Sequence, residues 1–472
     1  MRKVIALLAV FCTVLIAIVA TNQAELTNSG VQVSGQANVA VAQDDFIVHE
    51  WGTFTSFSGS DGVKLEFRPL VDNDLPQFVL DRARQSGVPH PFLKVNLRVL
   101  QRMETPVTYF YTDREREVNV HVGFPKGLLT EFYPPVESME PSFNWLKEPV
   151  ISDSKLDWGK IWLIPTDRLQ ADVTDSKLAE KLNSQIVQSL LPKSNAPNHY
   201  DYARETDAAI VYLQRQFDQK RPRTPAGDFF EKFLFYRGVG NFELPLTLEA
   251  VGQEQFKLLN KGPQAIRSLF LVSVEGEQIR FLTYDQIRAG QELIITQSEN
   301  SSTIDELAEA VVEALINERL YEKEARAMVK TWRSSWFGED GTRLFYMLPQ
   351  PITDELIPLH IDPQPQEMVR VLVGRMEIMS PEDEQKIMEL VKKSAAARAA
   401  HFAESASGHK SDAGKEAAQP YQLPSEILEL GRLGEPALVR VKNITTDVEI
   451  RNEAELLLTE LTEIRKAAAQ LD

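Results

Sequence analysis

The first twenty residues place the strongest constraint on how this chain can fold. A short basic start, Met1-Arg2-Lys3, precedes an uncharged and almost wholly apolar run over Val4–Ala20, and polar residues follow. This order is typical of a secretory signal peptide. We therefore expect residues 1–20 to direct the chain out of the cytoplasm, to the periplasm or the exterior. The alternative is an uncleaved membrane anchor formed by residues 4–20.

Export matters for the fold because Cys12, the only cysteine, lies inside this segment. The exported chain then has no disulfide, cannot hold zinc or iron through thiolates and has no cysteine nucleophile. Buried apolar area must supply its stability. A chain of 472 residues, 43% of them hydrophobic, is long enough to bury more than one core.

The charge of the chain disfavours two kinds of partner. The formal net charge is −17, and it becomes −19 (49 basic against 68 acidic residues) once residues 1–20 are removed, because they carry Arg2, Lys3 and no acid. Such an acidic chain repels phosphate backbones and anionic lipid. We predict no nucleic-acid partner, and membrane contact only through residues 4–20 if they stay attached.

The remaining chain predicts an α+β fold with a β-rich body. Residues 21–44 are small and polar, which favours a flexible leader. Residues 45–300 contain runs in which apolar and polar residues alternate, as they do in half-buried strands. The clearest run is Val118, Val120 and Val122 with polar residues between them.

Further elements follow from local patterns. Four or five short strand-like runs near residues 230–300 predict a β-sandwich-like module, and Leu75–Gln85 and Thr206–Phe217 predict helices. A helical and α/β extension is expected over residues 301–395. It begins with the capping box of Thr303 and Glu306, and a second helix carries Trp332 and Trp336 on one side.

The C-terminal end carries a resemblance to a helical repeat. Residues 396–420 predict a linker, and residues 421–472 predict a small helical segment. The strings Leu433-Gly434-Glu435-Pro436-Ala437-Leu438 and Asp447-Val448-Glu449-Ile450-Arg451-Asn452-Glu453-Ala454 resemble one HEAT-type repeat; a plain helical hairpin is the alternative. The resemblance implies that Asp447 caps the second helix, whose inner face is Ile450, Ala454 and Leu457. A single repeat cannot bury its own apolar face, so it either docks on the body or pairs with a partner.

The most distinctive string of the chain is His49-Glu50-Trp51-Gly52-Thr53-Phe54-Thr55. Helical metalloprotease motifs place a second histidine four residues after the first, but position 53 is threonine, so that motif is excluded. On a strand, His49 and Glu50 point to opposite faces. In the structural interpretation, Trp51 and Phe54 anchor the first strand and His49 is a hydrogen-bonded core residue.

A metal-site hypothesis remains open beside this structural interpretation. His49, His121 and Glu104 would supply two imidazoles and a carboxylate, a ligand set that suits zinc or iron. Glu50 is then the candidate general base. Nothing in the sequence brings these residues together, so we predict no cofactor and keep a divalent metal as the alternative.

Several strings together resemble an uncharacterised family of exported bacterial proteins with a His-Glu-Trp-Gly-Thr-Phe motif near the mature N-terminus. The resemblance implies export and a shared fold, and it supplies no activity or catalytic residue. The matching strings are Val48–Thr55, Met103–Pro106, Phe124–Leu128, Trp332–Trp336, Arg343–Tyr346 and Val369–Arg375.

We predict a non-catalytic exported protein that acts through contacts with other proteins or with cell-envelope components. This prediction rests on the HEAT-like segment, the sandwich-like module and the lack of any complete catalytic motif in the sequence. One alternative is a metal-dependent hydrolase that uses the candidate residues above. The other is a carbohydrate-binding β-sandwich protein, which requires exposed tryptophans in a row, from Trp145, Trp158 or Trp162.

Overall fold

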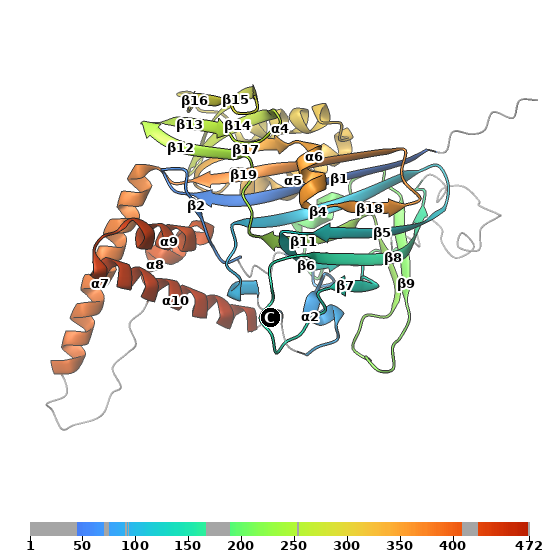
Figure 1. Cartoon of the computed structure of the whole chain (residues 1–472), viewed down its shortest axis with the longest axis horizontal. Coiled ribbons are helices and arrows are strands. Elements are labelled where there is room, and N and C mark those ends of the chain that lie inside the picture. Colours follow the sequence, from blue (N-terminus) through green and yellow to red (C-terminus); the bar gives the residue numbers. More distant parts are fainter. Residues whose placement is uncertain are drawn as a thin grey trace, which may run out of the picture. The chain divides into compact units, whose positions relative to one another are not determined.

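The protein is an α+β structure with a β-rich body of several sheets and a helical C-terminal segment (Figure 1). The predicted signal segment (residues 1–20), the leader (residues 21–44) and residues 408–420 of the predicted linker lie outside the described residues. No helix within the described ranges is long and apolar enough to cross a membrane. The computed structural model describes residues 45–69, 75–89, 92, 94–166, 189–252, 254–407 and 423–470.

A ten-stranded sheet forms the centre of the body. Its strand β1 (Phe46–Ser58) runs parallel to β19 (Glu367–Ile378) and antiparallel to β4 (Gln101–Thr112). Almost every residue of β1 is buried, because both faces of the sheet are covered. The other strands are β15 (Gln278–Ile287), β14 (Ile266–Glu275), β17 (Gly341–Leu348), β11 (Leu234–Gly240), β6 (Gly127–Tyr133), β3 (Leu80–Asp81) and β2 (Lys64–Leu65).

A six-stranded sheet packs against one face of the central sheet. Val118, Val120 and Val122 of β5 are fully buried in the core cluster between the two sheets, which confirms the alternation seen in the sequence. Phe54 of β1 and Trp158 of β8 belong to the same cluster. The strands are β10 (Gly227–Glu231), β9 (Ile210–Arg215), β8 (Ser154–Ile164), β5 (Arg116–Phe124), β18 (Leu359–Asp362) and β7 (Ser138–Glu140).

The region near residues 230–300 contributes to two sheets. The strands β12 (Leu246–Gly252), β13 (Gln255–Asn260) and β16 (Glu292–Thr296) form a separate three-stranded sheet. Leu258 of β13 shares a core cluster with Leu271 of β14, so two sheets pack face to face as in a sandwich. The strands β11, β14 and β15 belong to the central sheet, so this packing is part of the main body.

Two helices cover the other face of the central sheet, α4 (Ile304–Asn317) and α5 (Glu322–Phe337). The capping box of Thr303 and Glu306 is present at the start of α4. Trp336 on α5 lies 5.2 Å from Phe345 of β17 between ring centroids, so the tryptophan side of this helix is core.

Two predicted helices are wrong, wholly or in part. Within Leu75–Gln85, only α2 (Arg82–Gln85) is helical, and it begins after Asp81, whose side chain accepts from the N–H of Arg84. The stretch Thr206–Phe217 contains strand β9, because pairing with β8 and β10 outweighs the local helical pattern.

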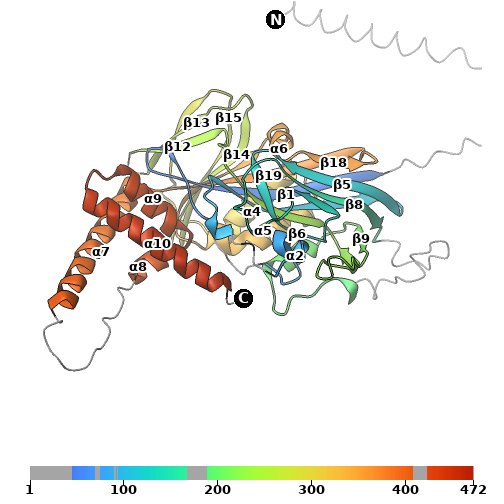
Figure 2. The ribbon, with the colours of Figure 1, turned by 60° about the horizontal axis from the view of Figure 1, so that its bottom comes forward.

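The C-terminal helices form a third cluster with the end of the body. Asp447 Oδ1 accepts from the N–H of Glu449 at 2.8 Å, as a helix cap does. Ile450, Ala454 and Leu457 are buried, and this face docks on the body. The helices α7, α9 and α10 pack together at one end of the body (Figure 2). The elements are α7 (Pro381–Ser407), α8 (Ser425–Glu429), η6 (Gly431–Leu433), α9 (Gly434–Ile444) and α10 (Val448–Gln470).

The predicted start of the linker is wrong, since α7 continues to Ser407. Arg398 on this part of α7 bonds Glu453 at 2.8 Å and Glu460 at 2.7 Å, both on α10. These charge-assisted bonds hold this part of α7 against α10. The segment is therefore an ordered helix, although its Ala- and Ser-rich composition is typical of a linker.

The bonds of Arg398 give a stability prediction. Glu453 is almost fully buried and accepts from Arg398 and from Ser394. We expect Glu453→Gln to cost about 1–3 kcal/mol, because a buried arginine loses part of its charged partner. Hydrogen exchange of α10 measures the effect. Unchanged protection of α10 would contradict this account of the docking.

Candidate functional site

Glu50 lies on the face of β1 that meets the second layer of sheets, where it is completely buried. Its carboxylate forms an ion pair with Arg370 Nη2 at 2.6 Å. It also accepts from the hydroxyl of Thr108 at 3.0 Å and from that of Tyr236 at 2.5 Å. Burial, followed by the charge of Glu50, raises the pKa of Tyr236 well above its usual value, so this phenol stays a donor. These bonds join β1 to β19, β4 and β11.

His49 points to the opposite face of β1, as predicted, and contacts helix α5. Its Nδ1 lies 2.7 Å from Glu324 Oε2, and Tyr111 donates to Glu324 Oε1 at 2.7 Å. The imidazole packs on Tyr321, with 4.4 Å between ring centroids. Burial raises the pKa of Tyr111, and Glu324 raises it further. His49 thus fastens the first turn of α5 to the sheet.

The structure does not bring together the residues of the predicted metal site. His121 lies on β5 in the six-stranded sheet and stacks on His360 of β18, with 4.6 Å between ring centroids. Glu104 lies on β4, where Thr55 donates to it at 2.7 Å. No group of three histidine, cysteine or acidic side chains within the described ranges has the arrangement of a metal site. The reason is topological, because His49 and His121 belong to different sheets.

The helix-covered face of the central sheet changes from apolar to charged beyond Trp336. On β19, Val373 is followed on the same face by Arg375 and Glu377, and on the antiparallel β17 Arg343 lies two residues before Phe345. Charged side chains from four strands, from η6 and from the turn between α5 and β17 meet here. We call them the arginine cluster: Arg102, Arg237, Arg343, Arg375 and Arg432 with Glu104, Glu339 and Glu377.

Short ion pairs hold the arginine cluster together. Arg375 Nη2 contacts Glu377 Oε1 at 2.5 Å, and Arg343 Nε contacts Glu377 Oε2 at 3.1 Å. Arg343 also donates to the carbonyl oxygens of Trp336 and Glu339 at 2.8 and 2.6 Å, which satisfies the C-terminal end of α5.

The arginines dominate the electrostatics of the cluster. Burial by itself raises the pKa of Glu104, but Arg102, Arg432, Arg375 and Arg237 outweigh this and bring it to about 2. The pKa of Glu377 is likewise lowered, because its arginine neighbours outweigh burial. Negative charge is therefore strongly favoured at this place.

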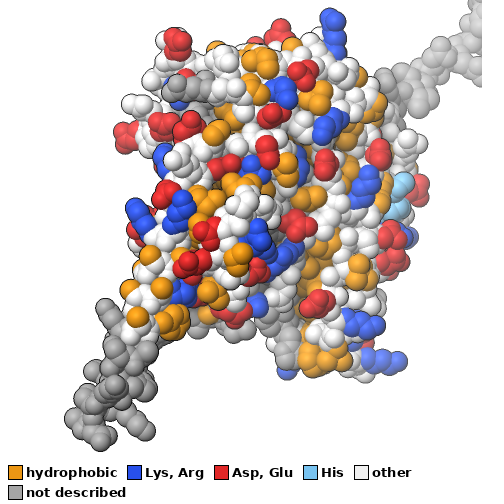
Figure 3. All heavy atoms as spheres, turned by 60° about the vertical axis from the view of Figure 1, so that its left-hand side comes forward, with side chains coloured by type: hydrophobic (Ala, Val, Ile, Leu, Met, Phe, Trp, Pro, Cys, Tyr) orange, Lys and Arg blue, Asp and Glu red, His pale blue; other side chains and the backbone are white. Residues whose placement is uncertain are grey.

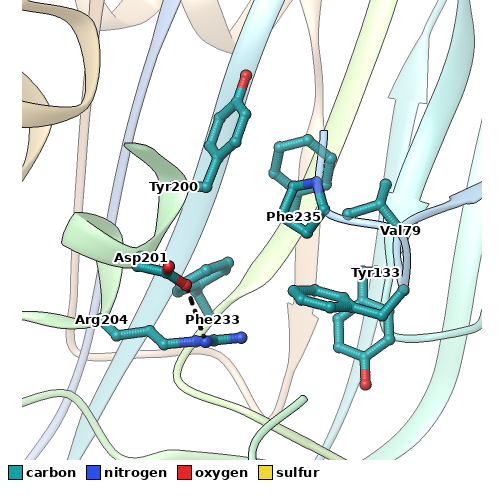
Figure 4. A pocket seen from close by; sticks show the side chains of 9 residues that line it. Val79, Tyr133, Tyr200, Asp201, Arg204, Phe233 and Phe235 are labelled. Atoms are coloured by element: carbon teal, nitrogen blue, oxygen red, sulfur yellow. Dashed lines mark hydrogen bonds and ion pairs between the residues drawn. The ribbon is translucent and has the colours of Figure 1, made fainter. Parts of the chain in front are cut away.

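An aromatic pocket lies beside the cluster (Figure 4). Its free interior is about 10 Å³, which is room for about one water molecule. Arg204 at its edge pairs with Asp201 at 3.2 Å and Glu231 at 2.7 Å. Tyr200 in its wall accepts a hydrogen bond from Arg237 of the cluster. The lining residues are Pro76, Phe78, Val79, Tyr133, Tyr200, Asp201, Arg204, Phe233 and Phe235.

One of the three tryptophans considered for carbohydrate binding does not reach the surface. Trp158 is fully buried and donates to the carbonyl of Pro134 at 2.9 Å, whereas Trp145 and Trp162 are exposed. On the face in Figure 3, acidic and basic side chains are interspersed, without a large region of one sign.

The arginine cluster does not stand out as a motif in the sequence. The signal available was the placement of Arg370 and Arg375 inside the mostly apolar run at Val369–Met376, and of Arg343 beside Leu344-Phe345. A charged residue at a core-facing position of a central strand needs a buried partner. That signal marks the positions, but it does not reveal which acidic residues meet them.

The comparisons with known proteins leave the family open. No family model matches the chain, and no curated protein matches it. Among solved structures, the yeast delta-COP-I mu-homology domain is similar with a TM-score of 0.25 and 7% identity, over 72% of this chain and 100% of that one. The same domain with a Dsl1 WxWxV peptide gives 0.24 and 6%, with the same coverage. Scores this low do not indicate a shared fold.

Proposed function

We propose that this chain is a non-catalytic exported protein that acts through contact with another protein of the cell envelope. The observation that carries the proposal is an exposed apolar segment after β7. Trp145 is 57% exposed, Leu146 73% and Val150 64%. Large apolar side chains grouped on a surface are typical of interaction sites.

The segment is held in place at both ends. Phe143 packs on Phe92, with 6.0 Å between ring centroids, and Ile151 contacts the same core cluster. Between them, Asn144 accepts from the N–H of Leu146 at 3.0 Å and forms a turn. A preordered apolar turn loses little conformational entropy on binding, which favours contact with a protein groove.

The charge of the chain favours a protein over a lipid surface as the partner of this exposed segment. The net charge of −17 repels anionic lipid. The polar groups of the distinctive motif also support a role without chemistry, because Glu50 and His49 are buried and bonded to other side chains. The partner we propose is an envelope protein with an apolar groove that receives Trp145 and Leu146.

Photo-crosslinking in cells of the native host tests this proposal. A benzoyl-phenylalanine placed at Leu146 should give a discrete adduct with one envelope protein. The matched control carries the same group at Phe217, a 62% exposed apolar residue in another loop. We expect no adduct from that position. The proposal fails if position 146 gives no adduct, or if both positions give the same products.

A further inference from the structure

Two buried donor groups beside the arginine cluster have no hydrogen-bond partner among the described residues. They are Nη1 of Arg375 and the hydroxyl of Thr53, whose side chains are 1% and 0% exposed. Both residues lie on the helix-covered face, because Thr53 pairs with Val373 and Thr55 with Arg375 between β1 and β19. Buried donors destabilise a fold unless an acceptor meets them, so this pair indicates a ligand that accepts hydrogen bonds.

An indole N–H borders the same region. Trp336 on α5 is buried, and its Nε1 atom makes no hydrogen bond within the described part of the chain. Trp336 packs on Phe345, which pairs with Arg375 between β17 and β19. Indole and guanidinium groups only donate hydrogen bonds. A group that satisfies them must therefore be an acceptor.

The charges of the cluster decide which kind of acceptor fits. Arg102, Arg375 and Arg432 surround Glu104 and hold its pKa at about 2, although burial raises it. Such surroundings favour an acceptor that carries negative charge over a neutral acceptor. Arginine forks also match the geometry of oxyanions.

We propose that the arginine cluster binds a small oxyanion of the phosphate or sulfate type, which accepts hydrogen bonds from Arg375 Nη1 and the hydroxyl of Thr53. This site goes beyond the contact role proposed above, since it lies in the interior of the body and not at the Trp145 segment.

The oxyanion enters at the rim of the cluster. Arg432 of η6 and Glu339 form an ion pair of 2.6 Å, and their side chains are partly exposed, unlike the inner members. Because η6 belongs to the C-terminal helical segment, opening this pair involves that segment. Oxyanion binding and docking of the C-terminal helices are then coupled, and the effect of each on the other is reciprocal.

Thr53→Val separates this proposal from a purely structural role of the cluster. The variant keeps the shape and every ion pair and removes only the hydroxyl. We expect it to weaken inorganic phosphate binding roughly tenfold to a hundredfold, because a hydrogen bond to a charged group is lost. Without phosphate, the variant should melt at the same or a higher temperature than the native chain. Calorimetric titration of the full chain at fixed ionic strength, with phosphate, sulfate and chloride, measures the affinities.

Thr353→Val is the matched control. Thr353 on α6 (Gln350–Leu356) is also fully buried, with a hydroxyl that has no partner among the described residues, but α6 packs on the other face of the central sheet. This variant should keep the native affinity for phosphate. The proposal is overturned if the native chain binds neither phosphate nor sulfate, or if Thr53→Val binds them as tightly as the native chain.

Discussion

Replacing Glu50 by glutamine is expected to cost about 3–5 kcal/mol of the free energy of unfolding, because the buried Arg370 loses its buried carboxylate partner and keeps only the partly exposed Asp354. The pair is fully buried, with 2.6 Å between Arg370 Nη2 and Glu50 Oε2. Tyr236 and Thr108 donate to the same carboxylate, so the change weakens bonds from β1 to three other strands of the sheet, β19, β4 and β11. Urea unfolding of the native and variant chains measures the difference.

Two further variants control this experiment. Glu117→Gln removes an ion pair with Lys160 at the surface, where the Lys160 side chain is 69% and the Glu117 side chain 36% exposed, and we expect no measurable change. The double variant Glu50→Gln with Arg370→Met removes both buried charges and should recover most of the lost stability. A loss below about 1 kcal/mol in Glu50→Gln would refute the structural role of this residue.

The second large effect is a loss of stability in acid that depends on Glu104. The pKa of Glu104 is about 2 in the folded chain, against 4.5 for an ordinary glutamate. A lowered folded pKa contributes stability that is full above the unfolded value and is lost as pH falls from about 4.5 to about 2. The shift corresponds to about 3 kcal/mol. Glu377 has a lowered pKa as well and adds in the same direction.

Urea unfolding at a series of pH values tests the role of Glu104. The native chain should lose stability steeply in this window. Glu104→Gln should be less stable at neutral pH and should show a shallower acid dependence, because one of the responsible carboxylates is gone. If the variant and the native chain have parallel pH profiles, Glu104 does not carry the charge assigned to it.

The sequence predicted those features that depend on local periodicity. The opposite orientations of His49 and Glu50 follow from the period of two of a strand. The capping box at Thr303 and the buried side of α5 follow from helical spacing. The burial of Ile450 and Leu457 likewise follows from their spacing on one helix.

Features that depend on distant parts of the chain were not predictable in this way. The stretch that contains β9 became a strand because its neighbours in the sheet lie elsewhere in the chain. Glu50 meets Arg370, and Glu104 meets Arg375 and Arg432, only after the sheet and the C-terminal helices have assembled. Side-chain type marks such residues as needing a partner, but pairing is set by topology.

The most direct test asks whether the exposed segment still contacts its partner when the buried pair of Glu50 and Arg370 is removed. The double variant Glu50→Gln with Arg370→Met, carrying benzoyl-phenylalanine at Leu146, lacks the buried ion pair between the motif and β19 and keeps the exposed segment. We predict that it forms the same envelope adduct as the chain with the native motif. A folded double variant that forms no adduct would contradict the account, because the motif would then take part in function beyond holding the sheet together.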